Sequence, residues 1–429
     1  MNEKVRSRLI EQNPHWKGPY SIPFKDRDIY PKLSKRMKER QILALCGLRR
    51  VGKTTLLRKL IIDLLQSHPA EAILYFSFDD FSGCELQDVL DETRSIHGKE
   101  PKYLFFDEIQ KLENWAEKLK LLYDNHDYKM VVSGSQSLLI RKGARESLAG
   151  RAYEFEVMPL DFSEYLSFRG MERLAEKPAL HASELKTEFH AYLRSAGFPE
   201  LAGQTDTELV REYIRETVIK RIVFVDMAKI YPIEDPGVLI SILEMLIDNP
   251  GMLVDYESFS QELGMSRQTV SKYFDYLEQA HLLRKLYNYS KNRSTSERKL
   301  KKYYPTFLSP ALSPRQDEEF YSKIVETCCV LNTDAQYFFR DKYQNEIDIV
   351  RVENGKPVPI EVKYRNVPNR KNALEAFGRR YAFSRAVVVT KDKAGEQKSG
   401  SVPVEYVPVH LFLLESAGAE SGGGKKLRL

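Results

Sequence analysis

The feature that most constrains this chain is a glycine-rich loop with the sequence Gly47-Leu48-Arg49-Arg50-Val51-Gly52-Lys53-Thr54. The loop fits the pattern G-x-x-x-x-G-K-[ST] in full, and it lies between an apolar run and a helix-like stretch. Loops of this kind surround phosphate oxygens with backbone N–H groups, while the lysine reaches the β and γ phosphates and the threonine hydroxyl binds Mg²⁺. A chance glycine turn before a helix is the alternative. We expect a site for ATP and Mg²⁺ formed by Gly47, Arg50, Gly52, Lys53, Thr54 and Thr55.

Apolar runs alternate with helical stretches around this loop. The runs are Gln41 to Cys46, Ala72 to Phe78, Tyr103 to Phe106 and Met130 to Ser133. Strands that alternate with helices form a mostly parallel sheet covered on both faces, which is a doubly wound α/β fold. The chain has 429 residues, a length that predicts roughly two to four domains. We place the α/β domain at residues 23–159, after an N-terminal arm of residues 1–22.

An acidic pair, Asp107-Glu108, follows the apolar run that ends at Phe106. We expect it at the carboxyl end of a buried parallel strand, where open α/β sheets bind their ligands. In that position Asp107 would hold Mg²⁺ and Glu108 would orient or deprotonate the attacking water. The alternative is an acidic pair that caps a surface helix. Ser135, after the next apolar run, is our candidate for sensing the γ-phosphate, although Ser-Gly-Ser is also common in turns.

These motifs resemble those of the AAA+ ATPases, and more closely those of prokaryotic ATPases fused to a nuclease-like C-terminal domain. The resemblance rests on the segments Gly47 to Thr55, Phe106 to Gln110, Ser133 to Ser135, Leu148 to Arg151, Pro159 to Glu164 and Gly197 to Glu200. It implies a catalytic arginine after the sensor strand that contacts nucleotide, often across a subunit boundary, and it leaves room for a homo-oligomer. Arg151 or Arg145 takes that role here, unless the side chain only pairs with a nearby carboxylate.

A helix-turn-helix pattern follows a helical region at residues 160–235, which we expect to form a lid. Residues 236–302 are predicted to form a winged helix, because three helical stretches precede a strand-like run and a basic segment from Arg284 to Lys302. The last of these helices exposes residue types that reach DNA bases and phosphates. The alternative is a winged helix that only packs against protein. Our candidates for DNA contacts are Arg267, Gln268, Lys272, Arg284 and Arg293.

Asn354-Gly355 separates two strand-like runs and is a strong signal for a two-residue hairpin turn. If these residues form the turn, Asp348 lies opposite Glu361 and Glu346 lies opposite Lys363. Two facing carboxylates repel each other unless a cation lies between them. A divalent metal ion is the simplest solution.

This hairpin resembles the PD-(D/E)xK nucleases through Asp348 and the segment Glu361-Val362-Lys363. The resemblance implies a restriction-endonuclease-like α/β domain, which we place at residues 303–414, in which two acids bind Mg²⁺ and Lys363 assists the water nucleophile. Glu326, in the preceding helical stretch, matches the upstream acid that such folds often supply to the metal. The alternatives are an exposed acidic strand neutralised by Lys363 and Arg365, or a degenerate nuclease fold kept for binding.

Composition limits the remaining classes. Hydrophobic residues make up 42% of the chain and charged residues 30%, which excludes global disorder. The 4 cysteines show no zinc spacing, and no signal peptide or membrane span is visible, so we expect reduced thiols in a cytoplasmic protein with no membrane partner. Residues 415–429 read as a flexible tail.

Together the motifs predict a Mg²⁺-dependent ATPase of the AAA+ class that couples its nucleotide state to DNA binding, with DNA cleavage as a further candidate activity. The alternative is a nucleotide-switched signalling or scaffold protein whose C-terminal domains bind protein partners with little ATP turnover. The presence of Glu108 favours the ATPase.

Overall fold

A computed structural model describes residues 3–79, 84–135, 146–292, 294, 296, 301–364, 372–399 and 402–420. The chain divides into two compact units, Met1–Met158 and Pro159–Leu429, which we call unit 1 and unit 2. All four cysteines are buried and free, as predicted; they are Cys46, Cys84, Cys328 and Cys329.

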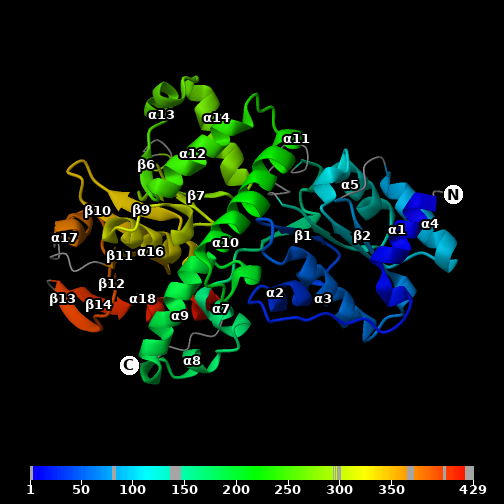
Figure 1. Cartoon of the computed structure of the whole chain (residues 1–429), viewed down its shortest axis with the longest axis horizontal. Coiled ribbons are helices and arrows are strands. Elements are labelled where there is room, and N and C mark those ends of the chain that lie inside the picture. The colour runs from blue at the N-terminus through cyan, green and yellow to red at the C-terminus, as the bar shows by residue number, and fades with distance from the viewer. Residues whose placement is uncertain are drawn as a thin grey trace. The chain divides into compact units, whose positions relative to one another are not determined.

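Unit 1 is built on a five-stranded parallel sheet with the strand order β2-β3-β4-β1-β5 (Figure 1). Strands β1, β3 and β4 are buried along their whole length, because their apolar residues face helices on both sides of the sheet. This confirms the predicted parallel α/β sheet. Its strands are β1 (Ile42–Cys46), β2 (Ile73–Ser77), β3 (Tyr103–Asp107), β4 (Lys129–Ser133) and β5 (Ala152–Glu156), and its helices are α1 (Glu3–Gln12), α2 (Tyr30–Arg36), α3 (Lys53–Leu65), α4 (Leu86–His97) and α5 (Trp115–Asn125).

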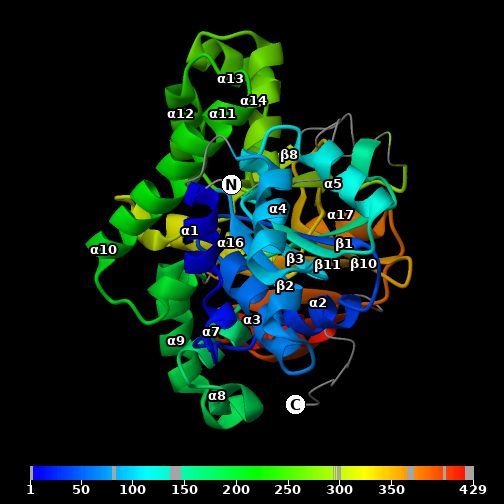
Figure 2. The same ribbon diagram turned by 90° about the vertical axis from the view of Figure 1, so that its right-hand side faces the viewer.

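Side chains of the N-terminal arm seal the free edge of β2. Asn13 exchanges two hydrogen bonds of 2.8 Å with the backbone of Tyr75, as a neighbouring strand would. The side chain of Gln12 pairs in the same way with the backbone of Ser77 (2.9 and 3.4 Å). The indole of Trp16 donates a hydrogen bond to the carbonyl oxygen of Ile73 (2.9 Å). Helix α1 packs against α4 beside this edge (Figure 2). The edge is therefore closed by side chains instead of by a strand.

Unit 2 begins with a helical region. Its helices are α7 (Phe162–Phe168), α8 (Arg173–Glu176), α9 (Ala182–Ser195), α10 (Thr207–Glu212), the π-helix η6 (Tyr213–Met227) and α11 (Ala228–Ile230). Asp206 caps α10 by accepting hydrogen bonds from the backbone N–H groups of Glu208 and Leu209. The following 15 residues continue as a π-helix, a form that usually occupies a single turn.

Three helices and three antiparallel strands follow in the order helix, strand, helix, helix, strand, strand. They are α12 (Pro236–Asp248), β6 (Met252–Val254), α13 (Tyr256–Leu263), α14 (Arg267–Gln279), β7 (Leu283–Asn288) and β8 (Lys301–Pro305), which we call the three-helix module. The predicted domain end at residue 302 lies inside β8. The lysines of β8 made this segment look polar in the sequence, but its Tyr303 and Tyr304 are fully buried.

The C-terminal part of unit 2 continues the same sheet. Parallel pairing of β7 with β9 joins the module to the rest and produces nine strands in the order β13-β14-β12-β11-β10-β9-β7-β8-β6. Helix α17 packs on the sheet face that carries Ile347, while α16 lies against β11. The added elements are α16 (Glu318–Asn332), β9 (Tyr337–Arg340), β10 (Glu346–Glu353), β11 (Lys356–Lys363), α17 (Asn372–Gly378), β12 (Ala386–Thr390), β13 (Gly395–Ser399), β14 (Val402–Pro408) and α18 (Val409–Glu420).

Candidate functional site

Glycine shapes the phosphate-binding loop between β1 and α3. Gly47 has φ 138°, and a Cβ atom there would lie 2.3 Å from the carbonyl oxygen of Val157, so a side chain does not fit. Arg50 (φ 68°) and Gly52 (φ 96°) adopt left-handed conformations that complete the curve. The loop ends directly before the first turn of α3. Backbone N–H groups at such a helix N-terminus are suited to bind phosphate.

Arg27 holds this loop from the segment before α2. Its guanidinium donates hydrogen bonds of 2.8 Å to the carbonyl oxygens of Val51 and Met158. The two contacts tie the loop to the last residue of unit 1. No sequence motif marks Arg27, because its partners lie 24 and 131 positions away.

Lys53 is buried, and its side chain turns back onto the loop. The ammonium donates to the carbonyl oxygens of Gly47 (3.0 Å) and Leu48 (2.7 Å). Burial lowers the pKa of Lys53, although Glu108 and Asp107 oppose that shift. A phosphate bound in the loop would offer this ammonium a charged acceptor, which makes a stronger hydrogen bond than a carbonyl.

Asp107 is the centre of a hydrogen-bonded cluster at the carboxyl end of β3. Thr54 Oγ1 donates to Asp107 Oδ2 at 2.6 Å, and the hydroxyl of Tyr75 donates to the same oxygen at 2.9 Å. The hydroxyl of Ser133 donates to Oδ1. The loop and the predicted acid therefore meet. Tyr75 and Ser133 were not among the predicted residues, since only the strand order shows that β2 and β4 flank β3.

Phosphate-binding loops of this kind imply Mg²⁺, and the donor set here fits that ion. Thr54 supplies a hydroxyl oxygen and Asp107 a carboxylate, which are the hard oxygen ligands that Mg²⁺ prefers. Both groups sit beside the end of the loop where the β and γ phosphates would lie. Thr54 and Asp107 are therefore the residues that would hold the ion.

Glu108 and the predicted sensor Ser135 are linked through Gln110. The amide nitrogen of Gln110 donates to Glu108 Oε2 at 2.6 Å and to Ser135 Oγ at 3.2 Å. Burial raises the pKa of Glu108, with Lys53 opposing the shift. A raised pKa suits a carboxylate that accepts a proton near neutral pH. Gln110 was not predicted, although it lies only two positions after Glu108.

Arg151, one of the two predicted nucleotide-contacting arginines, lies at the end of β1 away from the phosphate-binding loop of its own chain. The carbonyl oxygen of Arg151 accepts a hydrogen bond from the backbone N–H of Ile42, which is the first residue of β1. The phosphate-binding loop follows Cys46, which is the last residue of that strand. A strand of 5 residues spans roughly 17 Å. The guanidinium instead pairs with Asp124 through two contacts of 2.9 and 3.1 Å, as the alternative proposed. Arg145 lies outside the described residues.

The three-helix module presents the N-terminal half of α14 to solvent. Arg267, Gln268 and Lys272 are exposed, and none of them forms a hydrogen bond or ion pair with another described residue. Val270, Phe274 and Leu277 of the same helix are fully buried. The helix is therefore amphipathic, with its polar residues free to reach a partner.

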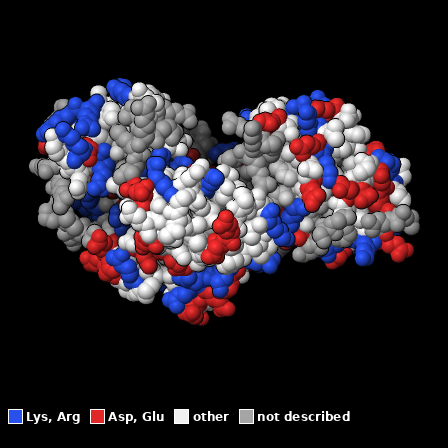
Figure 3. Space-filling model, turned by 90° about the horizontal axis from the view of Figure 1, so that it is seen from above, with Lys and Arg blue, Asp and Glu red and all other residues white. Residues whose placement is uncertain are grey.

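The basic segment from Arg284 to Lys302 is less available than the sequence suggested. Arg284 pairs with Asp334 at 2.8 Å, and Lys285 pairs with Glu278 at 2.5 Å. Lys302 is buried. Arg293 lies outside the described residues. Figure 3 shows both basic and acidic side chains on the face that it presents.

The predicted hairpin turn is confirmed. Asn354 (φ 49°) and Gly355 (φ 76°) both have left-handed conformations, and the strand pairs run from Glu353↔Lys356 to Ile349↔Ile360. These pairs end one position before Asp348 and Glu361. The side chain of Asp348 accepts a hydrogen bond from the backbone N–H of Val362 at 2.8 Å.

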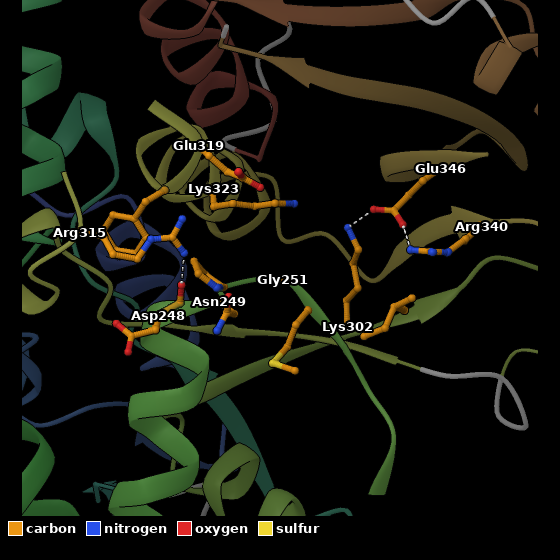
Figure 4. A pocket seen from close by; sticks show the side chains of 13 residues that line it. Asp248, Asn249, Gly251, Lys302, Arg315, Glu319, Lys323, Arg340 and Glu346 are labelled. Atoms are coloured by element: carbon orange, nitrogen blue, oxygen red, sulfur yellow. Dashed lines mark hydrogen bonds and ion pairs between the residues drawn. The ribbon is translucent and has the colours of Figure 1, made fainter. Parts of the chain in front are cut away.

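The side chains around this hairpin are mostly buried and paired. Glu361 Oε2 contacts the ammonium of Lys363 at 3.1 Å, while Oε1 is buried with no hydrogen-bond partner among the described residues. Burial raises the pKa of Glu361, and burial together with Glu326 raises that of Asp348 to about 7. The carboxylate of Glu346 lies between Lys302 and Arg340 (Figure 4), and it makes its ion pairs with these two residues.

Mg²⁺ is also implied by the nuclease resemblance, but the residues here do not fit it. Lys302, Lys323 and Tyr304 occupy both carboxylate oxygens of Glu326. Burial alone would raise the pKa of Glu326, but the two lysines outweigh it and lower the pKa to about 2. Among the described residues, no group of three or more His, Cys, Asp or Glu side chains is arranged to hold a metal ion.

A pocket of about 300 Å³ opens beside this network, between the turn after α12 and the first turns of α16 (Figure 4). Its charged side chains are largely paired with one another or with neighbours. Arg315 contacts Asp317 at 3.0 Å, Arg340 contacts Glu346 at 2.8 Å, and Lys323 contacts Glu326 at 2.8 Å. We assign no ligand to it.

Comparison with family models divides the chain into three parts. Residues 39–166 match a model described as an AAA domain. This segment has the P-loop AAA+ fold. Residues 186–309 and 327–412 match two models described as domains of unknown function, DUF8612 and DUF4143. The first of these includes β8, so it groups that strand with the three-helix module.

Two curated relatives of this chain are described as uncharacterised proteins. A protein of Methanocaldococcus jannaschii is 30% identical over 286 residues, which cover 64% of this chain and 62% of the relative. A protein of Haemophilus influenzae is 31% identical over 283 residues, which cover 62% of this chain and 64% of the relative. The chain thus spans less than two thirds of the length of either relative.

The solved structures that align with this chain are only distantly similar to it. The Aeropyrum pernix Orc1 protein in complex with DNA is 16% identical, with a TM-score of 0.28, over 75% of this chain and 94% of that one. The S. cerevisiae Hsp104-ADP complex is 15% identical, with a TM-score of 0.30, over 77% of this chain and 44% of that one. These TM-scores are too low to carry an inference. In the part of the chain that the structure describes, no helix is long and apolar enough to cross a membrane.

Proposed function

We propose that the AAA+ domain binds ATP with Mg²⁺ and hydrolyses it, and that its nucleotide state controls DNA binding by the three-helix module. The contact of 2.6 Å between Thr54 and Asp107 carries the first part. It places the phosphate-binding loop against the acidic pair at the carboxyl edge of a parallel sheet. That edge is where open α/β sheets bind ligands.

The residues of this site divide the work of hydrolysis. Lys53 would leave its two carbonyl partners and donate to the β and γ phosphates. Glu108 would take a proton from the water that attacks the γ phosphorus, and the bond from that phosphorus to the bridging oxygen would break to give ADP and inorganic phosphate. Mg²⁺, when bound, would neutralise charge on the β and γ phosphates.

Replacing the general base tests the hydrolysis. Glu108→Gln keeps the shape and the hydrogen bond from Gln110 but cannot accept the proton, so kcat should fall by about 10²- to 10⁴-fold with KM little changed. Glu113→Gln, an exposed glutamate of the same unit, is the matched control and should hydrolyse ATP at the wild-type rate. Equal kcat for the two variants would remove Glu108 from the reaction.

The free polar face of α14 supports DNA binding. The module has the element order of a winged helix, with α14 in the position that enters the major groove. Arg267, Gln268 and Lys272 can reach bases and phosphates without first breaking an ion pair. Arg284 would have to leave Asp334 to do so. We do not extend the function to DNA cleavage, because Glu326 is already occupied.

Fluorescence anisotropy with labelled duplex DNA tests this second part. Replacing both Arg267 and Lys272 with alanine should weaken binding and make its salt dependence shallower by about two phosphate contacts. Arg221→Ala, which removes an exposed arginine of η6, is the control. DNA binding by the wild type that does not change with salt would instead favour the alternative, a nucleotide-switched scaffold that binds protein. The ion pairs made by Arg284 and Lys285 of β7 support this alternative.

A further inference from the structure

A buried lysine lies at the centre of the carboxylate cluster in unit 2. Lys302 projects from β8, is 2% exposed, and places its ammonium 3.2 Å from Glu326 Oε1 and 2.5 Å from Glu346 Oε1. The ring of Phe338 lies 5.5 Å away and adds a cation–π contact. Figure 4 shows the side chain extended toward Glu346 at one end of the pocket.

The other donors complete the coordination of Glu326 by protein groups. The ammonium of Lys323 contacts Oε2 at 2.8 Å, and the hydroxyl of Tyr304 donates to Oε1 at 2.8 Å. Each carboxylate oxygen therefore has at least one donor. Lys302 and Tyr304 come from β8, and Lys323 comes from α16, the helix that also carries Glu326. The network therefore joins β8 to α16, and Lys302 and Glu326 are 24 positions apart in the sequence.

The cluster contains as many acidic as basic side chains. Its acids are Glu326, Glu346, Asp348 and Glu361, and its bases are Lys302, Lys323, Arg340 and Lys363. A divalent ion beside Glu326 would add two positive charges to this set. It would also have to displace the ammonium of Lys302, which is buried between the carboxylates of Glu326 and Glu346.

We propose that the ammonium of Lys302 permanently takes the place of the metal ion that the nuclease resemblance implies, so that this centre of unit 2 is a structural ion-pair network. The inference does not depend on ATP hydrolysis by unit 1. It gives unit 2 a nuclease-like arrangement of acids without a metal at Glu326, and it makes β8 the strand that locks the three-helix module to α16 and β10.

The sign of a stability change separates this network from an empty metal site. Carboxylates gathered for an absent metal repel one another, so neutralising one of them stabilises the metal-free protein. Carboxylates paired with lysines do the opposite, because a neutral replacement leaves a buried ammonium without its counter-ion. In EDTA, Glu326→Gln should therefore lower the Tm of unit 2 by roughly 5 °C or more, while the exposed Glu319→Gln on the same helix should not. An unchanged or higher Tm for Glu326→Gln would overturn the proposal.

Direct metal binding provides the second measurement. The full chain should carry Asp107→Asn, so that the metal site of unit 1 does not contribute, and Mn²⁺ binding should be followed by electron paramagnetic resonance without nucleotide. With Lys302 present we expect no bound Mn²⁺. With Lys302→Met added, the freed carboxylates should bind one Mn²⁺ with an affinity at least about 10-fold higher than that of the chain that retains Lys302.

The chain that retains Lys302 decides the question even where Lys302→Met fails to fold. If this chain binds one Mn²⁺ and Glu326→Gln abolishes that binding, the proposal is overturned. Absence of binding, together with the lower Tm of Glu326→Gln, supports it.

Discussion

The protein contains two buried acidic centres whose partners differ in kind. In unit 1, Asp107 accepts hydrogen bonds from the hydroxyls of Thr54, Tyr75 and Ser133, which are neutral. In unit 2, Glu326 is held by two lysines. Neutral donors leave the negative charge of a carboxylate uncompensated and available to a metal ion, whereas ammonium groups cancel it. The difference shows that the function of an acidic centre depends on its counter-ions as much as on its acids.

The largest effect should come from removing the counter-ion of unit 2. Lys302→Met leaves the buried Glu326 and the half-buried Glu346 without their shared cation, and should lower the free energy of unfolding of unit 2 by about 3–5 kcal/mol. Asp107→Asn, which neutralises the acid of unit 1, leaves no charge without a counter-ion because the partners of Asp107 are neutral hydroxyls, and it should cost less than about 1 kcal/mol. Urea unfolding followed by circular dichroism measures both. Similar losses in the two units would end the distinction between them.

The next effect concerns the cation that unit 1 reserves for its ligand. Lys53→Ala removes the ammonium that would meet the β and γ phosphates, and should weaken ATP binding by about 10- to 100-fold. Isothermal titration calorimetry measures the Kd directly. Lys99→Ala, which removes an exposed lysine of the same unit, serves as control. Unchanged affinity for Lys53→Ala would refute the site.

A smaller effect is expected from the hydrogen bond between Gln110 and Glu108. Burial raises the pKa of Glu108, and the amide of Gln110 lowers it by stabilising the charged form. Because the base must be deprotonated, kcat should fall as pH drops through that pKa. Gln110→Ala removes the donor, raises the pKa further and should move the acid limb of the kcat profile upward by about 0.5 to 1 pH unit. An acid limb that stays in place would show that Gln110 does not act through Glu108.

The smallest effect should follow from changing Arg151. Its guanidinium pairs with Asp124 at the sheet edge opposite the loop, so Arg151→Ala should leave kcat unchanged in dilute protein. A loss of activity that appears only as protein concentration rises would instead place this arginine at a neighbouring subunit. Measuring ATP hydrolysis over a range of protein concentrations distinguishes the two outcomes.

Motifs with fixed local spacing were predictable from the sequence. The phosphate-binding loop and the Asn354-Gly355 turn both depend on neighbours within a few positions, and the structure confirms their local conformations. Tyr75, Ser133 and Arg27 could not be predicted, because their contacts depend on strand order and on distant backbone atoms. Lys302 was misread for a related reason: a lysine in a polar segment suggests solvent, and only the pairing of β8 buries it.

The arm that seals β2 has a practical consequence for any attempt to isolate the AAA+ domain. A fragment that begins at residue 23 would lose Gln12, Asn13 and Trp16, and with them the partners of the backbone groups along one side of β2. An uncovered strand edge is a template for pairing with another chain. This fragment should aggregate under conditions in which a fragment that keeps α1 and the rest of the arm stays monodisperse. Insolubility of the shorter fragment would then indicate that the edge of β2 is exposed, and not that the P-loop core fails to fold.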